Sequence, residues 1–185
     1  MTTCMVKMRL LSVVLTLTAA SFLHGEGPQP QSSLSDPEKA TLMEQANSLQ
    51  EAFTNGDADL IIRKTHPSIF QMFKSREQFE TITREAVKNL PAKITIEKTD
   101  WGQPTGLYAN GDEDVCFVPK TMTMKLGAKH LQSVGYLVAV RQHGAKDWLF
   151  IDGAGMKGNP ALLYTLLPKL PRDIITPPNV ITMLP

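Results

Sequence analysis

The chain contains very little cysteine. Cys4 and Cys116 are the only two among its 185 residues, and Cys4 lies in an N-terminal segment that we expect to be cleaved off. One remaining cysteine cannot form an intrachain disulfide, so a hydrophobic core must hold the fold together. Because Cys116 lies in an apolar, strand-like run, we expect its thiol to be an inert core group and not a nucleophile.

The chain also lacks an excess of charge of either sign. It has 19 basic and 18 acidic residues, and loss of Lys7 and Arg9 with the N-terminal segment leaves 17 basic ones. Such a balance gives no electrostatic attraction for nucleic acid or for an anionic membrane surface. We therefore expect neither to be a partner.

The N-terminal apolar run is too short to cross a membrane. It extends over residues 10–23, which is 14 residues, whereas a spanning helix needs about 20. Lys7 and Arg9 precede it, and small residues at 19–21 lie within it. This order of basic, apolar and small residues is typical of a secretory signal peptide. An uncleaved anchor and a buried first helix are the alternatives.

We therefore predict that residues 1–25 are a signal peptide and that the protein is exported, to the periplasm or the extracellular space. No cysteine ends the apolar run, so we expect no lipid anchor and no other stable membrane anchor. The chain has no Asn-x-Ser/Thr sequon, which favours a bacterial envelope over a eukaryotic secretory route.

Signals for helices occupy the first half of the remaining chain. Residues 26–36 are rich in Pro, Gly, Ser and Gln and are expected to form a flexible leader. Ser35 with Glu38, and Ser75 with Gln78, have the spacing of helix capping boxes. Together with apolar residues at helical intervals, they predict helices over 37–55, 57–65 and 76–90, with a short strand over 68–73.

The second half has the pattern of β-strands. Five strand-like segments separated by Gly-containing turns predict an antiparallel meander over 92–101, 106–110, 114–126, 130–142 and 147–152. Helices followed by an antiparallel sheet make an α+β fold. We place the domain at 37–156 and a Pro-rich tail at 157–185. Proline prevents a continuous helix there, so we expect a brief helical turn and then an extended segment packed on the domain.

One motif has the spacing of a dinucleotide-binding turn: Gly153-x-Gly155-x-x-Gly158, directly after a strand-like run. That turn belongs to a β-α-β unit whose parallel partner strands follow it. Here the preceding strand comes last in the predicted meander. We interpret the glycines as the exit of the chain from its last strand, and we expect no cofactor.

Metal-ligand patterns are also lacking. His130 and His143 fall in turns, with no second histidine, cysteine or carboxylate at ligand spacing. The acidic run Asn110–Asp114 lacks the twelve-residue pattern of a calcium loop. We expect a solvated turn there and no metal site.

The segments FTNGDADLIIRKTHPSIF (residues 53–70) and DWLFIDG (residues 147–153) carry a resemblance to a known family. They are similar to the helix end, short second helix, His-Pro and final strand of the superfamily of nuclear transport factor 2 and ketosteroid isomerase. The resemblance covers roughly residues 38–153. It implies three N-terminal helices packed in a strongly bent antiparallel sheet, which leaves a conical pocket. Members include isomerases, cyclases, dehydratases and non-catalytic binding domains, so the resemblance indicates fold more than function.

An isomerase of this kind needs a base and a hydrogen-bond donor in an apolar cavity. Asp152 and His66 are weak candidates for the base, and we favour a strand-terminal turn for Asp152 and local backbone hydrogen bonding for His66. Strand and helix spacing place several large apolar side chains on shared faces. The expected pocket-lining residues are Leu49, Phe53, Trp101, Tyr108, Tyr136, Trp148 and Phe150, with packing as an ordinary core as the alternative.

These observations favour an exported, non-catalytic domain that holds a small apolar or amphipathic ligand, or that docks a partner in the cell envelope. The alternative is an exported isomerase or lyase, similar to ketosteroid isomerase or to a dehydratase, that acts on a small hydrophobic carbonyl compound. A third hypothesis is a homodimer formed through the sheet, with a vestigial pocket.

Export makes a direct prediction about the mature N-terminus. N-terminal sequencing of the protein from its native host should begin between Ser21 and Gly27, because the small residues at 19–21 mark the expected cleavage region. Recovery of the chain from the soluble cytoplasm with Met1 intact would contradict the prediction.

Overall fold

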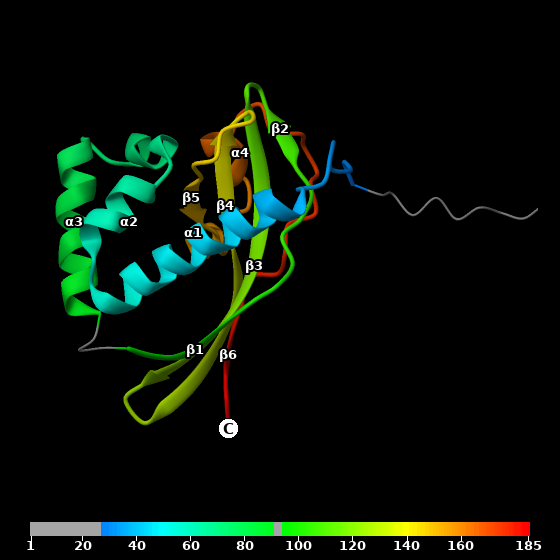
Figure 1. Cartoon of the computed structure of the whole chain (residues 1–185). Helices are drawn as coiled ribbons and strands as arrows, with labels where there is room; N and C mark the ends of the chain where they lie inside the picture. The colour runs from blue at the N-terminus through cyan, green and yellow to red at the C-terminus, as the bar shows by residue number, and fades with distance from the viewer. Residues whose placement is uncertain (1–26, 91–93) are drawn as a thin grey trace, which may run out of the picture.

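The computed structural model describes residues 27–90 and 94–185, and the predicted signal peptide lies outside them. Helices come first and an antiparallel sheet follows, so the α+β class is confirmed (Figure 1). Within the described part of the chain, no helix is long and apolar enough to cross a membrane. The helices are α1 (Asp36–Asn55), α2 (Ala58–Lys64), α3 (Arg76–Asn89) and α4 (Leu162–Leu166), with short 3-10 helices η1 (Pro67–Met72) and η2 (Gly153–Met156).

A capping box marks the start of α1, and a left-handed glycine marks its end. The Ser35 backbone N–H donates to Glu38 Oε2 at 2.9 Å, which satisfies a donor that the helix start leaves free. At the other end Gly56 has φ 83°, a left-handed conformation that glycine adopts without steric cost. The chain then turns directly into α2, where Asp57 accepts a hydrogen bond from the Leu60 N–H.

The strand predicted over 68–73 is wrong. This segment is the 3-10 helix η1, with Pro67 at its first position and the His66 side chain accepting a hydrogen bond from the Ser68 N–H. Proline is pre-organised for a helix start, and the capping histidine fixes the turn. Apolar residues that suggested a strand pack on α3 instead, since the Phe70 and Phe79 rings lie 5.0 Å apart.

A single antiparallel sheet forms the rest of the domain. Its strand order is β1-β3-β4-β5, with β2 paired to β3 and β6 paired to β4. The β3–β4 hairpin is continuous from Glu113 opposite Gln142 to Leu126 opposite Lys129, and Figure 1 shows it as the longest feature of the sheet. The strands are β1 (Thr95–Trp101), β2 (Tyr108–Asn110), β3 (Glu113–Leu126), β4 (Lys129–Gln142), β5 (Leu149–Asp152) and β6 (Val180–Met183).

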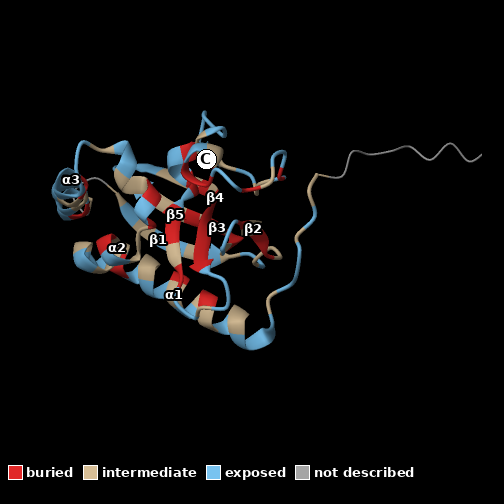
Figure 2. Cartoon of the chain, turned by 90° about the horizontal axis from the view of Figure 1, so that it is seen from above, coloured by how far each residue is buried: buried red, intermediate tan, exposed pale blue. Residues whose placement is uncertain are grey.

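Both faces of the hairpin are covered (Figure 2). On one face, here called the helix face, α1 contributes Leu42 and Ala46 to a cluster with alternate strand residues such as Cys116 and Val118. On the other, the tail face, residues of the C-terminal segment pack against the intervening strand positions. These tail residues are Met156, Leu163, Leu166, Leu167, Leu170 and Ile174. Residues 157–185 therefore supply core on one side of the sheet.

The predicted brief helical turn of the tail is α4, but the strand β6 was not predicted. Its residues pair with β4, with Ile181 opposite Ser133. The strand lies outside the meander order, and a pairing partner so distant in sequence leaves no local signal. Asn179, just before β6, donates a hydrogen bond to the Gly153 carbonyl at 2.6 Å, which attaches the tail to the end of β5.

Gly153 is a packing residue. A Cβ atom at this position would lie 2.6 Å from the Tyr136 carbonyl oxygen and 2.8 Å from its ring. The strand before it, β5, is antiparallel to β4, whereas the dinucleotide-binding unit requires parallel strands. The structure thus accounts for this glycine by close backbone approach.

If the tail is part of the core, shortening one of its buried side chains should destabilise the whole domain. Leu167→Ala should lower the free energy of unfolding by roughly 2–5 kcal/mol, because it removes a fully buried side chain. Urea unfolding followed by far-UV circular dichroism measures the loss. Ile175→Ala is the control, since Ile175 is 73% exposed and its truncation should change stability by no more than about 0.5 kcal/mol. Equal effects of the two substitutions would contradict the assignment.

Candidate functional site

A cavity of about 340 Å³ lies between the helices and the helix face of the sheet. In Figure 1, α1 crosses the upper part of the hairpin and its C-terminal end runs towards α2 and α3. The first turns of α1 therefore pack directly on the strands, while its last turns face the cavity. The apolar lining residues are Leu49, Phe53, Ile61, Leu90, Ile94, Ile96, Met122, Met124, Leu137, Phe150, Ala154 and Ile181.

The strand alternation explains which side chains enter the cavity. Successive residues of a strand point to opposite faces, so Val118, Lys120 and Met122 on β3 all lie on the helix face. Val118 is covered by the α1 cluster, and the next two line the cavity. Gly135 is paired with Lys120 across the hairpin and, having no side chain, adds no bulk beside it.

The most unusual cavity residue is Lys120, whose side chain is only 6% exposed. Its Nζ lies 3.2 Å from Asp152 Oδ2, and the Asp152 side chain is 56% exposed. The other oxygen of this carboxylate, Oδ1, accepts a hydrogen bond from the Ala154 N–H at 2.9 Å. Asp152 is thus both a strand-terminal cap and the ionic partner of a buried lysine, with both oxygens engaged.

Four further polar side chains line the cavity: Gln50, Lys64, Thr65 and Ser133. Thr65 Oγ1 donates to the Ile61 carbonyl at 2.8 Å. Gln50 on α1 has an amide nitrogen that is buried and has no hydrogen-bond partner among the described residues. Ser133 on β4 is buried. Lys64 on α2 donates to Gln45 Oε1 at 2.9 Å. Buried polar groups are normally satisfied, so the Gln50 nitrogen indicates a position where a bound molecule can accept a hydrogen bond.

Of the residues expected to line a pocket, the structure brings three to the cavity: Leu49, Phe53 and Phe150. Tyr108 and Tyr136 lie on the tail face, each stacked edge-on to Phe117 with ring centroids 5.8 Å apart. Burial raises the pKa of both phenols. The apolar residues of β4 occupy both faces of the strand, so alternation alone did not reveal which set faces the helices.

The two tryptophans are on the helix face but outside the cavity lining. The Trp148 ring is fully buried, and the Arg141 guanidinium lies over it at 4.6 Å. Trp101 donates from its indole nitrogen to Asn47 Oδ1 at 2.6 Å. Both side chains contribute to the packing of α1 against the sheet.

His66 forms a Ser-His-Glu arrangement outside the cavity lining. Its Nδ1 lies 2.8 Å from Ser68 Oγ and accepts from the Ser68 N–H, and its Nε2 lies 3.2 Å from Glu113 Oε1. A nucleophilic serine must reach its substrate, whereas Ser68 and His66 are both buried. The arrangement serves the start of η1 and its attachment to β3.

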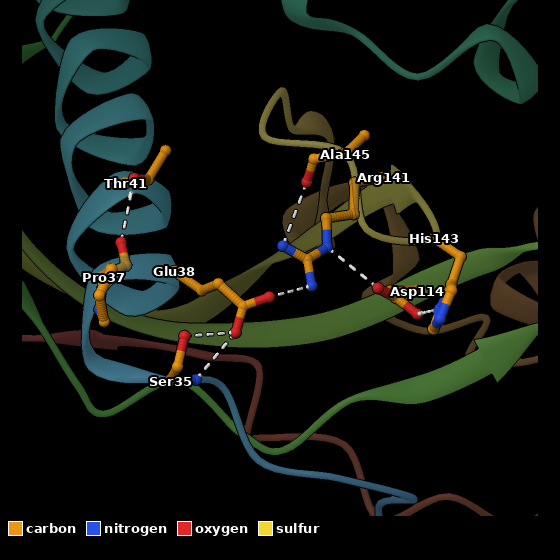
Figure 3. Close-up of polar contacts among 8 residues, drawn as sticks. All are labelled: Ser35, Pro37, Glu38, Thr41, Asp114, Arg141, His143 and Ala145. Atoms are coloured by element: carbon orange, nitrogen blue, oxygen red, sulfur yellow. Dashed lines mark hydrogen bonds and ion pairs between the residues drawn. The ribbon is translucent and has the colours of Figure 1, made fainter.

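Arg141 is the centre of a second polar network, shown in Figure 3. Its guanidinium donates to Asp114 Oδ2 at 3.0 Å, to Glu38 Oε1 at 2.5 Å and to the Ala145 carbonyl at 3.1 Å. His143 Nδ1 lies 2.8 Å from the remaining Asp114 oxygen. These contacts join the start of α1 to the sheet, and they engage the guanidinium on all three nitrogens.

Side-chain contacts engage two of the three acidic residues in the run at residues 110–114. Asp114 binds Arg141, and Glu113 binds His66 and the Asn110 side chain. Across residues 27–90 and 94–185, no group of three or more His, Cys, Asp or Glu side chains is arranged to hold a metal ion. Cys116 is fully buried, and burial raises the pKa of its thiol to about 11, which keeps it protonated and unreactive at neutral pH.

Among the lining residues that sequence reasoning missed, Lys120 has the most distinctive chemistry. A signal was present, because Lys120 has the same strand parity as Cys116, Val118, Met122 and Met124. A lysine on the apolar face of a strand is unusual. Its ionic partner Asp152 was singled out from its place at the strand end.

Comparison of the chain with protein-family models, with curated proteins and with solved structures finds no match.

The Arg141 network makes a prediction about acid stability. Hydrogen bonds from Ser35 and then from Arg141 lower the pKa of Glu38 from its ordinary 4.5 to about 2. A depressed pKa stabilises the fold above pH 4.5, and this stabilisation is lost as the pH falls towards 2. Glu38→Gln should reduce the free energy of unfolding by about 1 kcal/mol at pH 7, and the deficit should shrink between pH 4.5 and 2.

Urea unfolding at pH 7, 4 and 3 measures this convergence. Glu44→Gln is the control, because Glu44 is an exposed glutamate of the same helix. A deficit for Glu38→Gln that stays constant over this pH range would show that its carboxylate charge does not stabilise the fold.

Proposed function

We propose that this protein is an exported domain that binds a small apolar or amphipathic molecule in the cavity between its helices and its sheet, without catalysing a reaction. The observation that carries the proposal is the cavity itself, about 340 Å³ and lined mainly by apolar side chains. Ligand sites typically measure about 300–1,000 Å³ and have an apolar lining with a few polar groups. This cavity fits both criteria.

The arrangement of elements supports a further proposal, that the chain belongs to the cone-shaped superfamily of nuclear transport factor 2 and ketosteroid isomerase. Three helices precede a sheet that is antiparallel throughout, and the cavity lies between them. In that superfamily the conical pocket is the usual ligand site. The resemblance stated from the sequence and the cavity both point to the region between the helices and the sheet.

The polar groups of the cavity favour binding over catalysis. Asp152, the candidate base, accepts hydrogen bonds from Lys120 and from the Ala154 N–H, which hold its carboxylate at the end of β5. The phenols expected as oxyanion donors, Tyr108 and Tyr136, lie on the tail face. The candidate base and the phenol donors that the sequence suggested therefore lie on opposite faces of the sheet.

The alternative function is an exported isomerase or lyase that acts on a small hydrophobic carbonyl compound. The observation in its favour is a carboxylate and an ammonium group, Asp152 and Lys120, beside one apolar cavity. Catalysis would require the Asp152 carboxylate to accept a proton from the bound compound. The alternative therefore differs from the binding proposal in requiring turnover that depends on Asp152.

Filling the cavity tests the binding proposal. Apolar compounds of one or two rings, such as indole, naphthalene and α-tetralone, should raise the melting temperature of the wild-type domain saturably. The shift should be several degrees at 100 times Kd, because such saturation stabilises the folded state by about 2.7 kcal/mol. Leu49→Trp places a large ring in the cavity lining and should abolish the shift.

Ile175→Trp is the matched control, since it adds the same ring at a highly exposed position of the tail. It should retain the shift. Phe53→Asp supplies a second lining variant if Leu49→Trp does not fold. Absence of any shift across the panel, or equal shifts in the lining and control variants, would rule out the cavity as the binding site.

A further inference from the structure

We infer that the ligand of this cavity is a monoanionic carboxylic acid whose carboxylate is anchored by Lys120. The inference rests on the proposed binding function and adds the chemical class of the ligand. It is carried by three properties of the cavity: its unused hydrogen-bond donors, its charge and its size.

The deeply buried polar atoms of the cavity have hydrogens to donate. An ammonium group carries three donors, and among the described residues the Lys120 ammonium makes a single hydrogen bond, to Asp152. The Gln50 amide nitrogen adds donors from the opposite wall, on α1. The one carboxylate in the lining, that of Asp152, accepts hydrogen bonds from Lys120 and from the Ala154 N–H. A ligand that complements the donors of Lys120 and Gln50 presents hydrogen-bond acceptors.

The charge of the lining favours an acceptor that is also anionic. Two ammonium groups, on Lys64 and Lys120, line the cavity with one carboxylate, that of Asp152. Lys64 Nζ also lies 3.9 Å from Asp147 Oδ1, but the Asp147 side chain is 91% exposed and lies outside the lining, so water screens this pair. A bound monoanion therefore balances the charge of the lining itself. Hydrogen bonds between an ammonium and a carboxylate are roughly twice as strong as neutral ones, and the apolar walls reduce competition from water.

Size limits the rest of the molecule. An apolar cavity of about 150 Å³ holds a benzene molecule, so this one has room for roughly twice that, on the order of a dozen heavy atoms. Phe53, Met122 and Phe150 lie in its lining, and methionine adapts its shape to different apolar partners. An aromatic or medium-chain acid meets these limits.

A purely structural role for Lys120 makes a different prediction. Burying an ammonium group is costly, and replacing a buried ion pair by apolar groups is often neutral or stabilising. Here the partner carboxylate is half-exposed, so water can solvate it when the lysine is gone. If Lys120 serves binding, Lys120→Met should leave the melting temperature unchanged or raise it. If Lys120 is structural, the same substitution should lower the melting temperature.

The test compares two ligands of the same shape, 2-naphthoate and 2-naphthamide, by isothermal titration calorimetry at pH 7. The wild-type domain should bind the naphthoate about 10-fold more tightly, because a charge-assisted hydrogen bond replaces a neutral one. Lys120→Met should lose this preference while still binding the naphthamide. Lys125→Met, at an exposed lysine of the same strand, should keep the wild-type preference. Gln50→Leu should weaken the binding of both ligands.

The outcomes separate the two levels of the argument. Equal affinity for both ligands in the wild-type domain, or a preference that survives Lys120→Met, overturns the carboxylate inference and leaves the binding proposal standing. A destabilised Lys120→Met variant with unchanged preference shows that the lysine is structural and also overturns the inference. Binding of neither ligand, with no thermal shift from the neutral compounds, overturns the binding proposal as well.

Discussion

The constraint on which the rest of the structure depends is that the β3–β4 hairpin is apolar on both faces. Phe117 and Val138 point to one side, and Cys116 and Leu137 point to the other. A sheet exposed on either face would leave these side chains in water, and burial of apolar area is the main favourable term in folding. Two covers are therefore needed, and the chain supplies α1 for the first face and the C-terminal segment for the second (Figure 2).

The cavity follows from how the first cover fits. Arg141 holds the start of α1 to the sheet through Glu38 and over Trp148, so the helix is close to the strands at that end. Leu49 and Phe53, further along the helix, border open space instead of strand side chains. Lys120 lies in this open part of the helix face. A lysine fits on the apolar face of β3 only where α1 does not pack directly against the strand.

Local signals predicted most of the elements. The capping pairs at Ser35 and Ser75 and the left-handed turn at Gly56 gave helix positions, and the β3–β4 hairpin follows from its pattern. Interactions distant in sequence did not leave such signals: the pairing of β6 with β4, and the ion pair of Lys120 with Asp152. The face of the sheet on which Tyr136 lies could not be predicted either, because β4 is apolar on both faces. The strand prediction for the short segment after Pro67 is wrong because it relied on the apolar composition of that segment. The helix-start signals, Pro67 and the His66 cap, indicate the 3-10 helix.

A crystal structure with 6-bromo-2-naphthoate would show directly whether the cavity holds an acidic, apolar molecule against Lys120. Anomalous scattering locates the bromine without reference to the shape of the electron density. We expect one bromine site between Phe53 and Phe150, with a carboxylate oxygen within hydrogen-bond distance of Lys120 Nζ. A bromine bound elsewhere, or a cavity closed by the protein's own side chains, would contradict it.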